Sequence, residues 1–577
     1  MNDQHIDPGP GQRAPGAAQS VGPVPAAAHA NVATSAAPAH HHEHDAGVPA
    51  DRAGHIETHG IESIPESDRH GRPSGLFWVW MSANVGYLYF VIGGVLMLLG
   101  LSIWEALAVT VLGNLWWAAV GWLAVSGPAA GAPSVTIMRA MFGVRGNRIF
   151  GAGLGVAIGL FYEIINVAFA TLAAIALLAQ FGIVLPGGAE WAVLAVIGVL
   201  SFVIGVYGHA TILALAPWFS AALAVVFIVL AVFVFAAADF SYAPQSLPVA
   251  DHWAVLLLGF AIVASSPLSW GTGADYARYL PADVSKRAVA WYTALGGFVP
   301  ALVIGVLGIV AGTAIDMTDP QLTIGEIVPA WFTPVFLGMI VLSSVTNNVL
   351  VAYSTGFYLQ ALGVRISRAA TVVVTGVIAT AVAGWVLFLT PSFLDTLSSS
   401  LELSVTVLGP LVAVYAVDIL LRRNRYDGRA LDDTTPASPF WYRGGVFLPG
   451  VVTMLVAPAV AVMMANTTLY VGPIAAALGG ADLSALVGPV LAGGLYALLW
   501  LRTDPYRDAS RRPGATGAAA VGADATANAR DAASEDLHTA DPNTADPGTA
   551  DPITTDPTTE TTDAAASTRT LNMEVPA

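Results

Sequence analysis

Runs of about 20 apolar residues recur along most of this 577-residue chain, and this pattern constrains the fold more than any other feature. A run of that length is what an α-helix needs to cross a bilayer, and a lipid-exposed chain must satisfy its own backbone hydrogen bonds. The composition agrees, since 55% of the residues are hydrophobic and only 11% are charged. We therefore expect an all-α integral membrane protein with many transmembrane helices.

Twelve apolar spans are predicted, and the basic residues indicate how they are oriented. Every Lys and Arg falls in a tail or in a connection that follows an even-numbered span, whereas the odd-numbered connections carry acids and no Lys or Arg. Because cytoplasmic loops collect Lys and Arg, this predicts a multi-pass protein of the cell membrane (inner or plasma membrane) with both termini cytoplasmic. The expected spans are 76–101, 103–126, 150–180, 191–207, 210–238, 253–274, 288–314, 331–361, 369–390, 395–421, 444–465 and 484–501.

Two long tails flank the apolar region. Residues 1–75 are rich in Ala, Pro, Gly and His, and residues 503–577 carry the acidic repeat "TADPNTADPGTADPITTDPTTETTD". Both hold too few large apolar side chains to offset the entropy of ordering, so we expect disordered cytoplasmic tails around a transporter-sized domain at 76–502. The tract His40–Asp45, "HHHEHD", could hold Ni²⁺ or Zn²⁺, but a solvated, unstructured tract is the simpler interpretation.

Two spans contain residues that interrupt a helix. Span six runs into "SSPLSWGTGADYARYLP", with Pro267, Gly271 and Gly273, and span one contains "WVWMSANVGYLYF", with Ser82, Asn84 and Gly86. Many secondary transporters consist of two inverted five-helix units whose first helices are broken at the midplane. The spacing of five spans predicts such a five-plus-five repeat, with broken helices 1 and 6, one unit at 76–238, the other at 253–421, and two additional helices at 444–501. Gly, Ser and Pro that only allow close helix packing are the alternative.

Five separated stretches carry a resemblance to a known family. They are "GAPSVTIMRAMFGVRGNR", "GLFYEIINVAFATLA", "WGTGADYARYLP", "LSSVTNNVLVAYSTGFYLQALG" and "LGPLVAVYAVDILLRRNRYD". In this order they resemble the nucleobase:cation symporter family, which includes purine and cytosine permeases and their hydantoin and allantoin relatives. The resemblance implies a twelve-helix symporter that imports a small, flat nitrogen heterocycle with Na⁺ or H⁺ by alternating access.

A flat, uncharged heterocycle needs an aromatic face for stacking and amides that both donate and accept hydrogen bonds. Trp270 supplies a face and Tyr162 a second one, and Asn166 lies one helical turn after Tyr162. Asn347 and Asn348 diverge by about 100° on a helix, so we expect only one of them to point at the ligand. The candidate substrate-binding residues are Ser82, Asn84, Tyr162, Asn166, Trp270, Asn347 and Asn348.

Na⁺ and H⁺ both stay open as the coupling ion. For Na⁺, the family pattern suggests Ser343 and Ser344 facing the carbonyl of Ala83, although serines that only pack helices are the alternative. For H⁺, Glu163 and Glu402 are predicted at membrane depth, where an ionisable side chain is by default a functional hypothesis. We favour Na⁺ only slightly.

Asp275 and Arg278 lie one turn apart at the cytoplasmic end of the broken span. We expect an i, i+3 ion pair that anchors the helix end or acts in gating. A similar pair is expected between Asp418 and Arg422. One departure from the purine-cytosine permease pattern concerns Val351, where a further asparagine is expected; it puts cytosine and adenine recognition in doubt.

Other functions fit the sequence less well. A channel would more often show rings of charge or a repeated pore motif, an ATP-driven pump would need GxxxxGK[ST], and an enzyme would need a catalytic cluster at depth. With no cysteine, disulfides and thiol chemistry are excluded. We expect no enzymatic activity, no catalytic residue, no cofactor, no resident metal and no nucleic-acid partner, only the lipid bilayer and a small heterocycle. A proton-coupled transporter of another small polar solute is the alternative, and the sequence does not define the heterocycle or the oligomeric state.

Overall fold

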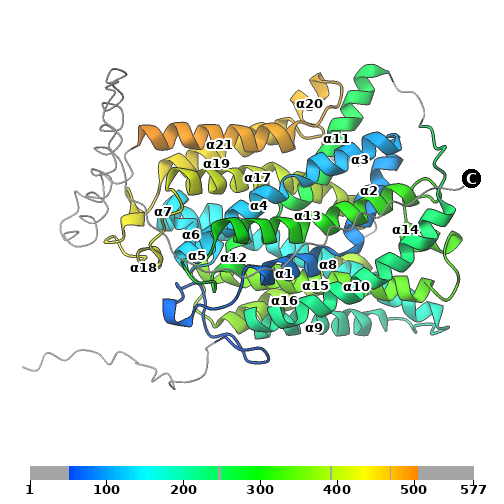
Figure 1. The fold of residues 1–577 in the computed structure, drawn as a ribbon, viewed down its shortest axis with the longest axis horizontal. Helices are drawn as coiled ribbons and strands as arrows, with labels where there is room; N and C mark the ends of the chain where they lie inside the picture. The colour runs from blue at the N-terminus through cyan, green and yellow to red at the C-terminus, as the bar shows by residue number, and fades with distance from the viewer. Residues whose placement is uncertain (1–50, 245–247, 390–392, 468–469, 504–577) are drawn as a thin grey trace, which may run out of the picture. The chain divides into compact units, whose positions relative to one another are not determined.

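The computed structural model describes residues 51–244, 248–389, 393–467 and 470–503. Helices make up nearly all of the regular structure in these ranges (Figure 1). The longer helices are α1 (Ser74–Asn84), α2 (Tyr87–Leu98), α3 (Ile103–Asn114), α4 (Trp117–Ala124), α7 (Arg139–Asn147), α8 (Leu154–Gln180), α9 (Glu190–Tyr207), α10 (His209–Ala237), α11 (Val249–Leu268), α13 (Lys286–Ala311), α15 (Thr333–Ala361), α16 (Arg368–Leu389), α17 (Phe393–Leu421), α19 (Leu448–Met463) and α21 (Ser484–Arg502).

Short helices cap or connect these elements. They are η1 (Glu66–Asp68), α5 (Ser126–Ala130), α6 (Ser134–Ile137), the π-helix η2 (Arg148–Gly153), α12 (Gly273–Ala277), α14 (Pro320–Thr323), η3 (Ile324–Glu326), α18 (Gly428–Asp432), η4 (Pro439–Trp441) and α20 (Pro473–Ala477).

Ten helical stretches of the described residues are long and apolar enough to cross a membrane, and α1 with α2 forms an eleventh candidate span that is bent by 59°. These eleven correspond to eleven of the expected spans. The remaining expected span, 444–465, corresponds to α19, which has 16 residues. Since about 20 residues are needed to cross a bilayer upright, α19 is shorter than a typical span, and the count of exactly twelve stays a prediction.

Both predicted helix breaks are present. Helix α1 ends at Asn84 and α2 begins at Tyr87, with Val85 and Gly86 in extended or irregular conformations between them. Helix α11 ends at Leu268, one residue after Pro267, and α12 begins at Gly273. Residues 269–272 therefore lie between the two helices. The bulk of each element is apolar, but the breaks expose backbone groups that only protein or a water-filled cavity can receive at membrane depth.

Small residues allow the helices to pack closely around these breaks. Helix α2 meets α13 through Gly93 and Gly308, where an added Cβ would collide with the backbone of the partner helix, at Gly305 and Phe90 respectively. Glycine at such positions lets two backbones approach, which is the main way that membrane helices gain van der Waals contact. Around this pair, α13 also packs on α1 and α4, α15 packs on α8, α9 and α16, and α17 packs on α19 and α21 (Figure 1).

Residues 51–73, here called the N-terminal strap, pack against one end of the helices, beside α5 and α12 (Figure 1). Backbone hydrogen bonds attach the strap to the ends of α5 and α9, from Ile64 N–H to the Gly131 carbonyl at 2.8 Å and from Glu57 N–H to the Tyr207 carbonyl at 2.9 Å. The Asp51 carboxylate lies 2.6 Å from the His209 ring at the start of α10. The strap is therefore part of the folded domain.

Glu57 is the buried centre of the strap. Its Oε1 accepts hydrogen bonds from Arg278 at 2.6 Å and from Tyr279 at 2.8 Å, and its Oε2 lies 3.3 Å from Nε of Arg368. The Tyr353 hydroxyl donates to the same Oε1 at 3.1 Å. Burial alone would raise the pKa of Glu57, but the two guanidinium groups outweigh it and lower that pKa to about 2.

Two expectations change as a result. The unordered tail expected up to residue 75 does not extend over residues 51–73, because a carboxylate there neutralises two buried guanidinium groups of the helices. The expected pair between Asp275 and Arg278 is not formed, since Arg278 turns to Glu57 and the Asp275 Oδ1 accepts from the Ser134 N–H at 2.7 Å. The expected pair between Asp418 and Arg422 is present at 2.9 Å. The tract His40–Asp45 and the tail from 504 lie outside the described residues.

Glu57→Gln tests the strap, because it keeps the side-chain shape and removes the charge that two buried guanidinium groups share. Removing one partner from a buried ion pair costs about 3–5 kcal/mol, so we expect a large loss of thermal stability in detergent at pH 7. The lowered pKa of Glu57 means that its stabilising charge is present above the ordinary pKa of 4.5 and is lost as the pH falls toward about 2. The difference between wild type and variant should shrink over that interval.

Glu66→Gln is the matched control, since Glu66 lies on the same strap, is largely exposed, and is 3.7 Å from Arg69. An exposed ion pair contributes about 0–1 kcal/mol, so this variant should melt close to the wild type. Equal melting of Glu57→Gln and wild type at pH 7 would show that the strap is not held by its buried charge.

Candidate functional site

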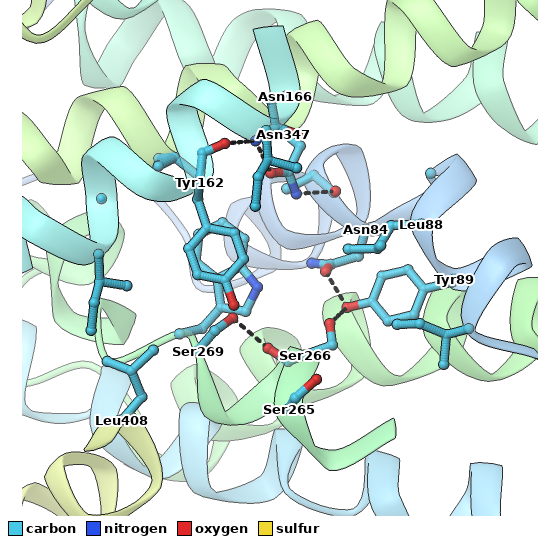
Figure 2. A pocket seen from close by; sticks show the side chains of 18 of the residues that line it. Asn84, Leu88, Tyr89, Tyr162, Asn166, Ser265, Ser266, Ser269, Asn347 and Leu408 are labelled. Carbon is cyan, nitrogen blue, oxygen red and sulfur yellow. Dashed lines mark hydrogen bonds between the residues drawn. The ribbon is translucent and has the colours of Figure 1, made fainter. Parts of the chain in front are cut away.

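A cavity of about 610 Å³ lies where the two helix breaks meet α8 and α15. Ligand pockets of small molecules fall in the range of about 300–1,000 Å³, so the cavity is large enough for a heterocycle. Its wall is mostly apolar, and Figure 2 labels several of its polar side chains, which project from α1, α2, α8, α11 and α15 toward one space. The polar members that line it are Asn84, Tyr87, Tyr89, Tyr162, Asn166, Ser265, Ser266, Ser269, Thr272, Ser343, Ser344, Asn347, Ser354, Thr355, Tyr358, Asn466 and Thr467.

Asn166 and Asn347 form one hydrogen-bonded pair across α8 and α15 (Figure 2). The Asn347 amide donates to the Ala83 carbonyl at 2.9 Å, at the end of α1, which fixes which atom of Asn347 is nitrogen. The Asn166 amide then donates to Asn347 Oδ1 at 2.9 Å and to the Tyr162 carbonyl at 3.0 Å. An amide has two N–H groups, so Asn166 keeps its Oδ1 acceptor and Asn347 keeps one N–H donor for a ligand.

A second chain of hydrogen bonds joins the two breaks. Ser266 on α11 donates to the Tyr89 hydroxyl at 2.7 Å, Tyr89 donates to Asn84 Oδ1 at 2.7 Å, and Asn84 donates to the Trp80 carbonyl at 2.6 Å (Figure 2). This chain satisfies a carbonyl near the end of α1 and links α1, α2 and α11. It therefore ties the two broken helices together at the cavity wall, where the helical backbone bonds stop.

Trp270 supplies the aromatic wall, and it stands in the non-helical stretch between α11 and α12. Its ring meets Trp80 edge to face, with centroids 5.2 Å apart and planes at 87°. Trp80 in turn contacts Tyr276 edge to face, and Tyr276 stacks on Tyr353. These rings form a layer between the cavity and the buried ion pairs of Glu57.

The cavity continues away from this aromatic layer. Val95 and Leu99 near the end of α2, Leu258 in the first half of α11, and Asn466 and Thr467 after α19 line its other end. These positions lie at the opposite ends of α2 and α11 from the aromatic layer. The cavity therefore extends toward the end of the helices remote from the strap, and it also reaches the strap-side ends of α8 and α15, where Gly155, Thr355 and Tyr358 line it.

The structure brings most of the predicted site residues together at this cavity. Those that line it are Ala83, Asn84, Tyr162, Asn166, Trp270, Ser343, Ser344 and Asn347. Three others do not line it. Ser82 is buried and donates to the Val79 carbonyl at 2.8 Å, Asn348 is buried on another face of α15, and Glu163 is buried behind the α8 wall. The side chain of Glu402 lies outside the described residues.

Several polar wall residues and the buried charges of the strap were not predicted from the sequence. Tyr89, Ser265, Ser266 and Ser269 line the cavity, and Glu57 and Arg368 anchor the strap. The serines stand in the stretch "SSPLSWGTGADYARYLP", whose Pro and Gly residues indicate a helix break but do not by themselves indicate which serines face a cavity. No sequence signal identifies Glu57, because its partners follow it by more than 200 residues.

No group of three or more His, Asp or Glu side chains in the described ranges is arranged to hold a metal ion. A hard cation would have to use oxygens of the cavity wall. The Ala83 carbonyl already accepts from Asn347 but keeps a second lone pair, and the Tyr87 N–H faces Ser343 Oγ at 3.5 Å beside it.

Comparison with known proteins identifies the family. Residues 63–488 match the family described as permease for cytosine/purines, uracil, thiamine, allantoin. This match covers most of the chain, and the protein belongs to that family. It is therefore a permease of the membrane-transporter class and not an enzyme, and the resemblance found in its sequence motifs is confirmed.

Relatives and solved structures agree with this assignment. The "Putative purine-cytosine permease YxlA" of Bacillus subtilis (strain 168) is 25% identical over 468 residues, which cover 77% of this chain and 96% of the relative. The structure of Mhp1, a nucleobase-cation-symport-1 family transporter, with bromovinylhydantoin bound matches with a TM-score of 0.60 and 18% identity. That match covers 78% of this chain and 98% of Mhp1, and inward-facing Mhp1 matches with a TM-score of 0.58 and 16% identity. At these identities the structures show a shared fold.

Proposed function

We propose that the protein imports a small, flat nitrogen heterocycle together with a cation by alternating access. The observation that carries this proposal is the paired amide of Asn166 and Asn347 beside Trp270, in a cavity formed at two helix breaks. Family membership supports transport of a heterocycle, and bromovinylhydantoin bound to Mhp1 is an example of such a ligand.

The amide pair favours one kind of ligand edge. Asn166 offers an acceptor and Asn347 offers a donor from adjacent positions. A ring amide, with N–H and C=O side by side, presents the complementary donor and acceptor, so the pair suits uracil, hydantoin, allantoin or an oxo-purine. Adenine has no ring amide, and the apolar Val351 at the cavity wall likewise offers no further hydrogen bond. A heterocycle with a ring-amide edge is therefore the proposed substrate class.

The proposed architecture contains twelve membrane-spanning helices, with α1 to α10 and α11 to α17 as two inverted repeats and α19 and α21 added. The matching positions of the breaks, at the first helix of each proposed repeat, support this division. Both termini are proposed to be cytoplasmic, in the cell membrane, because the strap end of the helices carries Arg278, Arg368 and Arg422.

In this orientation the cavity extends toward the outside along α2 and α11 and reaches the cytoplasmic ends of α8 and α15, and it is closed toward the cytoplasm beside α1 and α12. The closed side has two layers, first the rings of Trp270, Trp80 and Tyr276, and then the ion pairs of Glu57. Inward release would require both layers to part while the outer end closes, which is an exchange between two states of one protein. A channel would need a continuous path, and these two layers argue against it.

Na⁺ is proposed to bind at the Ala83 carbonyl with the hydroxyls of Ser343 and Ser344. These residues line the cavity near the break between α1 and α2. A cation there would lie close to Asn347, because Asn347 donates to the same carbonyl. Cation and substrate binding would then share a coupling free energy. Glu163 stays the candidate for H⁺.

The pocket is tested by Asn166→Ala and Trp270→Leu, measured as binding of a panel of heterocycles to the purified proteins. Stranding a buried ligand donor costs about 1–3 kcal/mol, whereas stacking contributes about 0.5–1.5 kcal/mol beyond area burial. Asn166→Ala should therefore weaken binding at least as much as Trp270→Leu. It should also weaken ring-amide ligands selectively, while Trp270→Leu should weaken all flat ligands by similar factors.

Asn348→Ala is the control for this experiment, because Asn348 is adjacent to Asn347, is fully buried and does not line the cavity. It should bind the panel like the wild type. If the Asn166→Ala and Trp270→Leu proteins are well folded and bind each ligand of the panel with wild-type affinity, the substrate binds elsewhere.

Ser344→Ala tests the Na⁺ site. If Ser344 helps to hold Na⁺, the substitution should reduce the increase in heterocycle affinity that Na⁺ produces, and should change affinity without Na⁺ much less. Isothermal titration with and without NaCl measures both quantities. Ser201→Ala on α9 serves as a buried-serine control that does not line the cavity. An unchanged Na⁺ effect in Ser344→Ala would remove this serine from the site.

A further inference from the structure

Glu163 is a buried carboxyl group that the cavity wall leaves unused. It lies on α8 one residue after Tyr162, is fully buried, and does not line the cavity. Its carboxyl group faces Thr355 on α15 and Thr375 on α16. It is therefore enclosed among three packed helices.

In this arrangement the two threonine hydroxyls donate their protons to backbone carbonyls instead of to Glu163. Thr355 donates its proton to the Val351 carbonyl at 2.8 Å, and Thr375 donates to the Val372 carbonyl at 3.3 Å. Each hydroxyl therefore turns an oxygen lone pair toward Glu163, and neither carboxyl oxygen has a hydrogen-bond partner among the described residues. A protonated acid has one O–H to donate to such an oxygen, and an ionised carboxylate has none.

Within the described ranges, no cation forms an ion pair with Glu163 either. Arg368 begins α16, but its guanidinium is engaged by Glu57 and by the Gly205 and Val206 carbonyls. The other titratable groups on α8 and the helices packed against it are Tyr162, Tyr353, Tyr358, Glu190, Tyr207 and, in η2, Arg148; none forms an ion pair with Glu163 in the described structure. An unpaired buried charge costs several kcal/mol, so this packing fits the neutral acid.

Thr355 connects Glu163 to the cavity. It lines the cavity wall and also faces the carboxyl group, and Gly159, one turn before Glu163, packs directly on its side chain. If the Thr355 hydroxyl turns from the Val351 carbonyl toward the cavity, it can pass its own proton to cavity water while accepting the proton of Glu163. The hydroxyl is unchanged, the carboxyl loses one proton, and water gains it.

We propose that Glu163 is the protonation site that couples proton movement to substrate transport, with Thr355 as its link to the cavity. The proposal rests on the proposed transport function and selects H⁺ as a coupling ion, at a place separate from the Ala83 and Ser344 region. Glu163 is protonated in the arrangement described above. It releases its proton when the cavity state changes and the wall at Thr355 becomes hydrated.

Infrared difference spectroscopy tests the protonation site without any substrate. The probe is the proton, and the readout is the carbonyl stretch of a buried, protonated carboxyl group in wild type and in Glu163→Gln at pH 7. The wild type should show a band that Glu163→Gln lacks and that Glu190→Gln keeps, since Glu190 is a partly exposed acid at the start of α9. Identical spectra for wild type and Glu163→Gln would overturn the proposal.

Coupling is tested in sodium-free liposomes with radiolabelled uracil, hydantoin, allantoin and hypoxanthine as probes. For one proton per substrate, an imposed gradient of about one pH unit supports up to about tenfold accumulation. The wild type and Glu190→Gln should accumulate a probe when the lumen is alkaline. Glu163→Gln, which resembles the protonated acid, should still exchange internal for external probe but should lose accumulation driven by the gradient.

The outcomes separate this proposal from the proposed function. Proton coupling at Glu163 would be overturned if Glu163→Gln accumulated the probe under the pH gradient as well as the wild type does. It would also be overturned if accumulation by the wild type followed a Na⁺ gradient and ignored pH. Either result would leave transport of the heterocycle established. If the wild type transports none of the probes, the proposed substrate class fails, and the infrared band alone decides whether Glu163 is a protonation site. If the Glu163→Gln protein does not fold, the wild-type spectrum still tests the proposal. A wild-type spectrum without the band of a buried, protonated carboxyl group would contradict it.

Discussion

A helix that stops inside a bilayer leaves backbone N–H and C=O groups that lipid cannot satisfy, and the arrangement of this protein depends on how two such stops are accommodated. The breaks after Asn84 and Leu268 meet each other. Side chains take over the bonding there, because Asn84, Tyr89 and Ser266 link α1, α2 and α11, and Asn347 holds the Ala83 carbonyl. The polar groups that satisfy the breaks are also the groups that line the cavity. Stability of the breaks and recognition of a ligand therefore use the same residues.

The two ends of the cavity are built differently. Toward the strap, aromatic rings and then a buried carboxylate shared by two arginines close the path beside α1 and α12, whereas Gly155 and Tyr358 still line the cavity at the strap-side ends of α8 and α15. Toward the other end, the wall consists of apolar side chains of α2 and α11 and the segment after α19. A buried ion pair contributes little net stability, but removing only one of its partners leaves an unpaired buried charge and is strongly destabilising. The ion pairs of Glu57 with its two arginines are therefore expected to form together or to break together when this end of the cavity closes or opens. Glu57 joins a segment before the first helix to α12 and α16, which belong to the proposed second repeat.

Part of this architecture could be predicted from the sequence, and the limits have physical causes. Apolar runs and Gly, Pro and Ser clusters predicted the spans and both breaks, because these follow from local backbone and lipid constraints. The divergence of adjacent helical positions predicted that one of Asn347 and Asn348 would face the cavity, and Asn347 does. Glu57 could not be recognised, since a polar segment looks unordered until buried guanidinium groups 200 residues later provide its partners. The sequence predicts Glu163 as an acid at membrane depth. It does not predict that Glu163 points away from the cavity, because this depends on how α8 is rotated about its axis, and hydrophobicity alone does not define that rotation.

The central claim is that the amide pair and Trp270 together form the substrate site. A cryo-electron microscopy structure of the wild-type protein with the tightest-binding heterocycle of the panel tests it most directly. The account predicts a flat ligand against the Trp270 indole, with its ring N–H and C=O within hydrogen-bond distance of Asn166 Oδ1 and Asn347 Nδ2. A ligand bound outside the cavity, or inside it with neither amide in contact, would contradict the account.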